Sequence, residues 1–235
     1  MSIFVIGDLH LSFKNSKPMD IFGDNWADHE EKIGNNWTEN VKEDDLVILP
    51  GDFSWETYLE DTKLDFEYLN SLPGKKLLLK GNHDYWWTTV TAMRNFLKEN
   101  NFTNIEFLYN NSYEFENKII CGTRGWSIAD EDMDKKLINR ELIRLELSLK
   151  DGIQKYGNNK EIIVFMHYPP ITRAKVISQQ EAEFVKLMKK YNVKRCYYGH
   201  LHGASIVDAI EGDVEGIEFR LVSADGLDFK LLKIL

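Results

Sequence analysis

The stretch Lys76-Leu-Leu-Leu79, followed at once by Lys80-Gly-Asn-His-Asp-Tyr-Trp86, decides how the rest of the sequence is interpreted. The aliphatic run predicts a short buried strand, and the polar run begins where that strand ends. In open α/β sheets, ligands bind beyond the carboxyl ends of the strands. Asn82 offers a carbonyl oxygen, His83 an imidazole, and Asp84 a carboxylate that could orient that imidazole. Since Gly, Asn and Asp are also common in turns, a simple turn is the alternative for this motif taken alone.

Four other apolar runs predict buried strands that end in polar groups of the same kind. They span residues 2–6, 45–50, 161–166 and 193–198, and they lead into Asp8-Leu9-His10, Gly51-Asp52, His167 and Gly199-His200-Leu201-His202. If the segment after the first run is extended, Asp8 and His10 project to the same side. A strand-terminating loop is the alternative for each motif. If every motif were only a loop, five of the six histidines would follow apolar runs by chance.

The side chains at these strand ends predict a metal centre. Histidine nitrogens with aspartate and asparagine oxygens, and no cysteine, suit Mn, Fe or Zn, whereas a purely oxygen set would indicate Mg or Ca. The candidate ligands are too many for one tetrahedral ion, but their number suits two ions that share a carboxylate. Two ions about 3.5–4 Å apart can hold a hydroxide and the oxygens of a phosphoryl group for in-line displacement.

These residues are where the chain resembles a known family, the calcineurin-like metallophosphoesterases. The five motifs are similar in order and spacing over about residues 2–210, and they are Asp8-x-His10, Gly51-Asp52, Gly81-Asn82-His83-Asp84, His167 and Gly199-His200-x-His202. The combination of Gly-Asn-His-Asp with Gly-His-x-His is the most specific part. The resemblance implies an α/β fold, a four-layer α/β/β/α sandwich of two mixed sheets flanked by helices, with a dinuclear metal site at the carboxyl ends of the strands.

The resemblance also implies a role for each motif residue. One ion would be held by Asp8, His10, Asp52 and His202, and the other by Asp52, Asn82, His167 and His200, so that Asp52 bridges the two. His83 would stabilise the phosphoryl group or protonate the leaving oxygen, with Asp84 orienting its ring. A metal-bound hydroxide would be the nucleophile. No motif residue is missing, so we expect an active enzyme.

Three side chains are expected to contact the substrate, namely Asn82, Arg124 and Arg173. Arginine suits phosphate and carboxylate oxygens because its planar guanidinium can bind both oxygens at once. A surface salt bridge is the alternative for both arginines. The loops at 11–28 and 122–127 and the pair Trp86 and Trp87 are further candidates for selectivity, with core packing as the alternative for the tryptophans.

The intervening sequence predicts helices and additional strands. Helices are expected at 26–41, 55–71, 86–101, 130–150 and 178–191. The helix at 130–150 is expected to face solvent, because it carries many residues of opposite charge. His29 is expected to be a solvated helix residue. A strand at 105–109, a hairpin of 112–115 with 119–121, and antiparallel strands at 205–210, 217–222 and 229–234 complete the pattern. We find no repeat or linker and expect one domain over residues 1–235.

Composition restricts the classes of partner. The formal net charge is −9 without any long basic run, so a nucleic-acid polymer is not expected as a partner. Cys121 and Cys196 lie in or beside apolar runs and are expected to be buried rather than disulfide-bonded. The first residues lack the basic segment of a signal peptide, and no apolar run reaches the length of a membrane span. A cytoplasmic protein without membrane attachment is therefore expected.

The substrate is much less defined than the reaction. The expected function is hydrolysis of a small phosphomonoester or phosphodiester, because the short chain leaves little room for a cap or a nucleic-acid domain and its acidic balance disfavours a DNA or RNA polymer. One alternative is a protein Ser/Thr phosphatase, which would need a broad, shallow groove. Another is a non-catalytic interaction scaffold with the same fold, although such relatives tend to lose site histidines. The sequence does not define the oligomeric state.

Overall fold

The computed structural model describes residues 1–127, 131–178 and 182–235 and contains two β-sheets. The first sheet has the order β11-β1-β2-β3-β4. Its strands are β1 Ile3–Val5, β2 Leu46–Leu49, β3 Lys75–Leu78, β4 Ile105–Phe107 and β11 Leu232–Lys233. β1 to β4 are parallel, and only the edge strand β11 is antiparallel to its neighbour. The sheet is therefore mixed, and its parallel strands end at one common edge.

The second sheet has the order β5-β6-β7-β8-β10-β9. Its strands are β5 Tyr113–Phe115, β6 Lys118–Thr123, β7 Glu161–Met166, β8 Arg195–Tyr198, β9 Gly212–Val214 and β10 Ile217–Leu221. The central pairs from β6 to β10 are parallel, while β5 and β9 form antiparallel hairpins with β6 and β10. The hairpin predicted after β4 is thus confirmed. The expectation that 217–222 is purely antiparallel is wrong, since β10 pairs in parallel with β8.

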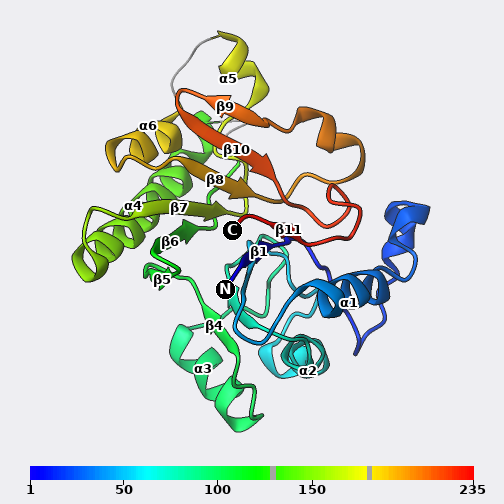
Figure 1. The fold of residues 1–235 in the computed structure, drawn as a ribbon. Helices are drawn as coiled ribbons and strands as arrows, with labels where there is room; N and C mark the ends of the chain where they lie inside the picture. The colour runs from blue at the N-terminus through cyan, green and yellow to red at the C-terminus, as the bar shows by residue number, and fades with distance from the viewer. Residues whose placement is uncertain (128–130, 179–181) are drawn as a thin grey trace.

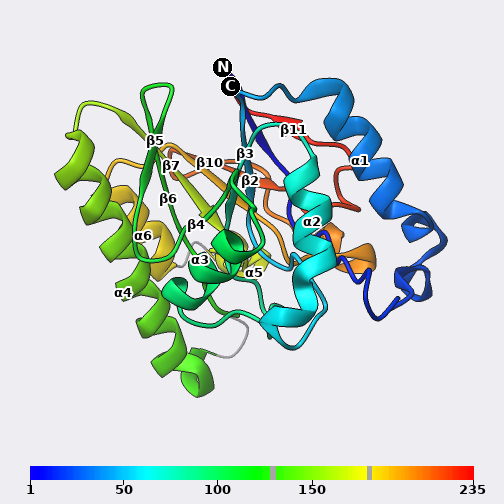
Figure 2. The same cartoon turned by 90° about the horizontal axis from the view of Figure 1, so that it is seen from below.

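The two sheets face each other, and helices cover the outer face of each (Figures 1 and 2). The helices are α1 His29–Asn40, α2 Lys63–Ser71, α3 Val90–Glu99, α4 Glu131–Tyr156, α5 Arg173–Ser178 and α6 Glu183–Lys190. In Figure 2, α1 and α2 lie on one side of the sheets, and α4 and α6 lie on the other. Three separate apolar clusters fill the spaces between these layers. The predicted four-layer α/β/β/α sandwich is confirmed.

Side-chain alternation explains why the strands read as unbroken apolar runs. Along β1, Ile3 and Val5 face the second sheet, while Phe4 packs under the helices. In β2, Ile48 faces the second sheet, and Val47 and Leu49 face the helices. Both faces of the central strands are therefore buried, and every position favours an apolar residue.

Several predicted elements differ in extent or type. Four short 3₁₀ helices are present among the described residues, at Met19–Phe22 (η1), Asp24–Trp26 (η2), Leu59–Thr62 (η3) and Gly203–Asp208 (η4). The last of these replaces the strand predicted at 205–210. The first predicted helix begins at His29 rather than at residue 26, because η2 occupies that stretch. Residue 130 and residues 179–181 of two predicted helices lie outside the described residues.

Helix α4 is not purely a solvent-facing helix. Its buried side includes Leu145 and Leu149 together with Glu141 and Ser148, and it packs against β6. The buried polar residues are hydrogen-bonded, with Ser148 accepting from the backbone of Gly122 and Glu141 accepting from Thr123. In the part of the chain that the structure describes, no helix has the length and apolar character needed to cross a membrane.

Candidate metal centre

The polar side chains predicted at the strand ends converge at one edge of the two sheets. Asp8 and His10 follow β1, Asp52 follows β2, and Asn82 and His83 follow β3. From the second sheet, His167 follows β7, while His200 and His202 follow β8. The parallel order brings these strand ends together although the residues are up to 194 positions apart in sequence (8 to 202). The site therefore lies across the opening between the sheets.

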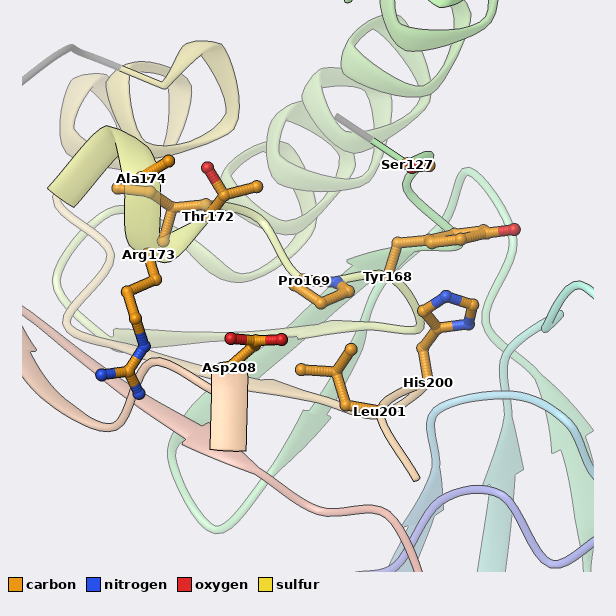
Figure 3. A pocket seen from close by; sticks show the side chains of 10 residues that line it. Ser127, Tyr168, Pro169, Thr172, Arg173, Ala174, His200, Leu201 and Asp208 are labelled. Atoms are coloured by element: carbon orange, nitrogen blue, oxygen red, sulfur yellow. The ribbon is translucent and has the colours of Figure 1, made fainter. Parts of the chain in front are cut away.

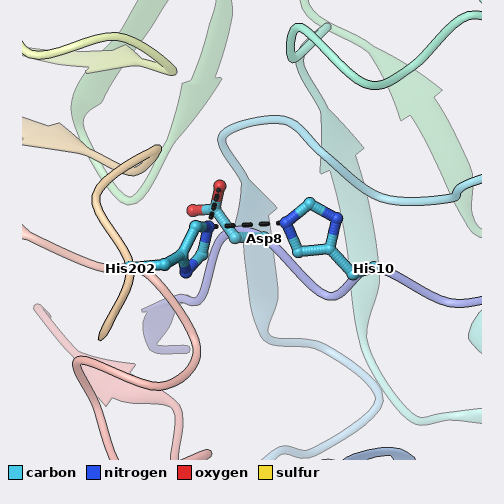
Figure 4. Close-up of side chains that lie close together, drawn as sticks. All are labelled: Asp8, His10 and His202. Atoms are coloured by element: carbon cyan, nitrogen blue, oxygen red, sulfur yellow. Dashed lines mark hydrogen bonds and ion pairs between the residues drawn. The ribbon is translucent and has the colours of Figure 1, made fainter. Parts of the chain in front are cut away.

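One half of the site combines side chains from both sheets. Asp8, His10 and His202 point toward one another in Figure 4. The Nε2 atoms of His10 and His202 are 3.4 Å apart, and His202 Nε2 is 3.2 Å from Asp8 Oδ1. Asp52 Oδ2 is 3.8 Å from His10 Nε2. These four residues form the set expected for the first ion.

The other half is organised around Asn82 and His167. Asn82 Oδ1 is 2.6 Å from His167 Nε2 and 2.9 Å from His200 Nδ1. His167 Nε2 is in turn 3.6 Å from Asp52 Oδ2. The same Asp52 oxygen thus lies near an imidazole nitrogen of each half. Asp8 Oδ1 also lies near a histidine of each half, 3.2 Å from His202 Nε2 and 3.7 Å from His167 Nδ1. His167 Nδ1, however, contacts the carbonyl group of Pro50 at 3.1 Å, whereas Asp52 Oδ2 faces Nε2, the His167 nitrogen that lies beside Asn82.

The donor atoms fit divalent transition-metal ions. Bonds of about 2.1 Å place neighbouring ligand atoms of one ion about 3.0–3.4 Å apart. Four of the spacings above, at 3.2, 3.4, 3.6 and 3.8 Å, are close to these values and are long for hydrogen bonds. The donors are imidazole, carboxylate and amide groups, the ligands expected for Mn, Fe or Zn.

Burial and neighbouring charges shape the ionisation of this cluster. Burial lowers the pKa of His10 well below its usual value and lowers that of His167 to about 3. Burial alone would raise the pKa of Asp8, but His202, His167 and His10 lower it to about 2. Burial, with Asp84 and Asp8 nearby, raises the pKa of Asp52. Neutral imidazoles of His10 and His167 beside crowded carboxylates are a donor set that cations would stabilise.

The backbone bends sharply where it presents these groups. Asp8, His10, Asp52 and His200 all have positive φ angles, of 60°, 49°, 51° and 74°. Non-glycine residues rarely adopt this conformation, which costs about 1–3 kcal/mol and concentrates at functional sites. Asp8 and His10 therefore converge through a turn. The expectation that strand alternation aligns them is wrong.

Two glycines allow the strand ends to approach the carboxylates. A Cβ on Gly81 would lie 2.0 Å from Asp52 Oδ1 and 2.2 Å from the Asp52 backbone nitrogen. A Cβ on Gly199 would lie 2.2 Å from Asp8 Oδ2. The Gly-Asn-His-Asp and Gly-His-x-His motifs thus need glycine because any side chain would displace a carboxylate of the cluster.

Asp84 has a different role from the predicted one. Its carboxylate accepts hydrogen bonds from the backbone N–H groups of Asp52, Phe53 and Gly81 at 2.9, 2.9 and 2.6 Å, and from Trp86 Nε1 at 3.0 Å. Within the described residues, Nδ1 of His83 has no hydrogen-bond partner. The expectation that Asp84 orients the His83 ring is therefore wrong for this structure. Asp84 instead joins the turn after β2 to the turn after β3.

His83 lies at the edge of the cluster, half-buried. Its backbone N–H donates to Asp52 Oδ1 at 2.8 Å, and its ring packs against Trp55 with 4.3 Å between ring centroids. Burial lowers its pKa, and Asp8 opposes this shift. The ring is 5.8 Å from that of His10, so it stands beside the candidate ligands without belonging to either set.

Sequence reasoning missed two residues that support the cluster. Asp225 follows β10 and accepts a hydrogen bond from His202 Nδ1 at 2.8 Å. Burial lowers the pKa of His202, but Asp8 and Asp225 outweigh burial and raise this pKa to about 10. The position of Asp225 after an apolar strand is the feature of the sequence that could have identified it.

The second residue is His29. It was expected to be solvated, but it is buried and contacts the carbonyl groups of Leu9 and Trp26 at 3.1 and 3.2 Å. It therefore supports the turn that carries His10.

The two arginines predicted to bind substrate lie outside the ligand cluster. Arg124 lies over the Trp126 ring at 4.5 Å, and its backbone carbonyl accepts from His167 and Tyr168. Arg173 lines a cavity of about 360 Å³ that also includes His200. In Figure 3 its guanidinium points away from His200, and it donates to the carbonyl groups of Val207 and Ala209.

The tryptophans next to the Gly-Asn-His-Asp motif belong to the core. Trp86 and Trp87 are both buried, and Trp86 packs edge-on against Phe53 and Phe66. The core-packing alternative is therefore the one that the structure supports. The aromatic side chains that line the site are instead Trp26 and Trp55, each in ring contact with His10.

The fold is similar to that of several solved structures. Phosphopantetheinyl hydrolase from Mycobacterium tuberculosis has a TM-score of 0.58 and 14% identity, covering 100% of this chain and 95% of that chain. A protein of unknown function from Aquifex aeolicus, AQ665, has a TM-score of 0.51 and 18% identity over 99% and 95%. The protein TT1561 of Thermus thermophilus has a TM-score of 0.52 and 12% identity over 98% and 96%. At these identities the similarity concerns the fold alone.

Sequence comparison identifies the family. A search of curated proteins gives no match. A model of the calcineurin-like phosphoesterase family, however, matches residues 1–204, which is most of the chain and includes all five motifs. The chain therefore belongs to the calcineurin-like phosphoesterase family.

Proposed function

We propose that this chain is a dinuclear metal-dependent hydrolase of a small phosphomonoester or phosphodiester. Membership of the family supports a metal-dependent phosphoesterase in general. The observation that carries the finer proposal is the position of Asp52 Oδ2, 3.8 Å from His10 Nε2 and 3.6 Å from His167 Nε2. A carboxylate oxygen between two histidine groups suits a ligand shared by two ions.

The proposed ligands follow from the two halves of the cluster. The first ion would be held by Asp8, His10, Asp52 and His202, and the second by Asp52, Asn82, His167 and His200. When bound, two such cations lower the pKa of water to provide the nucleophile and stabilise charge on the phosphoryl oxygens. Mn, Fe and Zn are the candidates because the donors are imidazoles, carboxylates and an amide.

The chain's own contribution to the reaction centres on His83. Its half-buried ring lies beside the cluster and is fixed by Trp55 and by the backbone contact to Asp52. In this position it can hold a proton for the leaving oxygen, a role that typically contributes about 10²–10⁴-fold to the rate. Asp84 acts indirectly, because its four hydrogen bonds above fix the backbone that carries Asp52.

The remaining expectations are part of the same proposal. A small phosphorylated substrate, in a single-domain cytoplasmic protein, is favoured over a phosphoprotein or a membrane partner. The formal net charge of −9 argues against a nucleic-acid polymer. Asn82 and Arg124 are proposed to meet substrate oxygens, and Arg173 to contribute little, because its guanidinium already donates to the carbonyl groups of Val207 and Ala209. The scaffold alternative is disfavoured by the presence of His83 and every proposed ligand.

The direct test is ester hydrolysis by metal-stripped protein reloaded with Mn. We expect metal-dependent turnover of p-nitrophenyl phosphate or bis-p-nitrophenyl phosphate, and the preferred ester distinguishes a monoesterase from a diesterase. Asp52→Asn should abolish turnover, and His83→Ala should lower kcat by about 10²–10⁴-fold. Asp61→Asn, which removes a carboxylate paired with Lys14 away from the cluster, is the matched control and should keep normal turnover.

Three results would contradict the proposal. Absence of turnover of both esters with two ions demonstrably bound would favour the scaffold. Equal turnover by the Asp52→Asn protein and the parent would remove the shared carboxylate from the mechanism. Efficient dephosphorylation of a phosphoserine peptide, with both small esters poor, would favour the Ser/Thr phosphatase instead.

A further inference from the structure

A cavity of about 320 Å³ opens directly beside one half of the metal cluster. Its walls come from the 3₁₀ helices η1, η2 and η4, from Trp55, and from three histidines of the site. The lining residues are His10, Met19, Phe22, Trp26, Trp55, His83, His202, Gly203 and Ala204. We call this space the aromatic cavity. Its volume is that of a small-ligand pocket.

The lining of the aromatic cavity is mostly apolar, and its polar part comes from three histidines. Met19, Trp26 and Trp55 provide fixed walls, since Met19 and Trp26 are buried and Trp55 Nε1 donates to Met19 Sδ at 3.0 Å. Phe22 forms the outer edge, with 61% of its surface exposed. Among the residues that line it, only the site histidines can carry charge. The cavity therefore favours an uncharged, flat group.

A second cavity, on the opposite half of the cluster, has a different chemistry. It measures about 360 Å³ and includes His200, Tyr168, Arg173 and Asp208 (Figure 3). This cavity is called the polar cavity after Arg173 and Asp208, because it contains a guanidinium and a carboxylate, whereas the aromatic cavity contains neither of these groups. His83 lines the aromatic cavity and does not line the polar one. The position of His83 thus distinguishes the two spaces.

We propose that the aromatic cavity binds the leaving group of the substrate, and that this group is an uncharged aromatic alcohol. The inference rests on the proposed phosphoesterase function and adds the chemical class of its substrate. Hydrolysis forms a P–O bond to the oxygen of water and breaks the P–O bond to the leaving oxygen, which takes up a proton. Since His83 is the proposed source of that proton, the leaving group lies on the side of the site that His83 lines.

The test compares leaving groups of similar acidity but different shape. Phosphate esters of 2-naphthol, phenol and hexafluoroisopropanol are hydrolysed by the Mn-loaded protein and by two variants that narrow one cavity each. Ala204→Trp fills the aromatic cavity, and Ala174→Trp, its matched control, fills the polar one. Mn content is measured for each variant, so that any disturbance of the neighbouring ligand His202 is recognised.

The expected result is a preference that only one variant removes. The kcat/KM of the parent should be about tenfold higher for the naphthyl ester than for the alkyl ester, which corresponds to about 1.4 kcal/mol. Ala204→Trp should bring this ratio close to one, and Ala174→Trp should leave it unchanged. Phe22→Ala should lower the ratio to an intermediate value, because it removes one aromatic edge.

A binding measurement separates this inference from the proposed function. Equilibrium dialysis of 2-naphthol against metal-free protein should show saturable binding that Ala204→Trp weakens about tenfold and Ala174→Trp does not change. Loss of all ester turnover with this binding intact would overturn the phosphoesterase proposal alone. Turnover without a naphthyl preference, a preference removed by Ala174→Trp instead, or an absence of naphthol binding would overturn the cavity assignment.

Discussion

The floor and the rim of the site are built in different ways. The floor, defined as Asp8, His10, Asp52, Asn82, His167, His200 and His202, follows five parallel strands and is mostly buried. The rim, defined as residues 11–28, Arg124 and Arg173, lies on 3₁₀ turns, loops and the start of α5, and includes exposed apolar side chains such as Ile21 and Phe22. The sheets thus position the candidate metal ligands, and we propose that substrate selectivity depends on the segments of the rim.

The largest expected effect comes from adding one methyl group to the floor. In Gly81→Ala the new Cβ would lie 2.0 Å from Asp52 Oδ1 and 2.2 Å from the Asp52 nitrogen, so the backbone must move. We expect loss of tight Mn binding and a fall in kcat/KM of more than about 10²-fold, since small misplacements in a site have effects of this size. Calorimetric Mn titration and ester kinetics measure both.

The control for this change is Gly216→Ala. Gly216 has a φ of 81°, and a Cβ added there would meet no atom within 4 Å, so this variant carries a backbone penalty of about 1 kcal/mol without a contact. Normal Mn binding by Gly81→Ala would show that metal binding does not require the close approach of the turn after β3 to the turn after β2.

The next largest effect is expected for Asp84→Asn. An asparagine has one acceptor oxygen for a position that now accepts several N–H groups, so buried donors lose partners. We expect the free energy of unfolding of metal-free protein to fall by about 2–4 kcal/mol. Urea denaturation measures this, with exposed Asp228→Asn as the control, for which a change below about 1 kcal/mol is expected. Equal stability of the two variants would contradict the linking role of Asp84.

A smaller, selective effect is expected for Asp225→Ala. Asp225 holds the Nδ1 side of His202, and loss of such a partner typically weakens metal affinity about 10–100-fold. Because His202 belongs to one half of the cluster, only one of the two Mn-binding steps should weaken. Calorimetric titration resolves the steps. If both Mn-binding steps weaken equally, or if neither weakens, then Asp225 does not support one half of the cluster selectively.

The smallest effects are expected at the rim. Arg173→Gln should change kcat/KM for small esters by less than about threefold, because the guanidinium already bonds two backbone carbonyl groups. Arg124→Gln should raise KM by up to about tenfold without changing kcat, because the variant loses one charged hydrogen bond to the substrate. Steady-state kinetics distinguishes the two parameters. A large fall in kcat in either variant would show that the arginine acts on the reacting groups and not only at the rim.

The sequence contained enough information to predict the floor, for a physical reason. A buried parallel strand leaves an apolar run, and its end is marked when a glycine is followed by Asp, Asn or His. Asp52, Asn82 and His200 all follow such a glycine. The parallel sheets then bring those ends together, which is why side chains far apart in sequence could be grouped in advance.

What the sequence did not reveal depends on contacts between turns. The partners of Asp84 are backbone N–H groups of the turn after β2, and their direction depends on positive φ angles that the sequence pattern does not show. The burial of His29 depends on the loop that folds over α1. Gly203–Asp208 forms a 3₁₀ helix whose start is held by hydrogen bonds between His202 and Ser205 and by the Gly203 backbone N–H, which donates to Asp225 at 2.8 Å.

The central claim is that two ions share Asp52, and electron paramagnetic resonance of Mn-loaded protein tests it most directly. Titration should saturate at about two Mn per chain with a spectrum of exchange-coupled ions, because a shared carboxylate holds them about 3.5–4 Å apart. Asp52→Asn should lose the coupled signal. Saturation at one Mn per chain, or two Mn with the spectrum of isolated ions, would contradict the account.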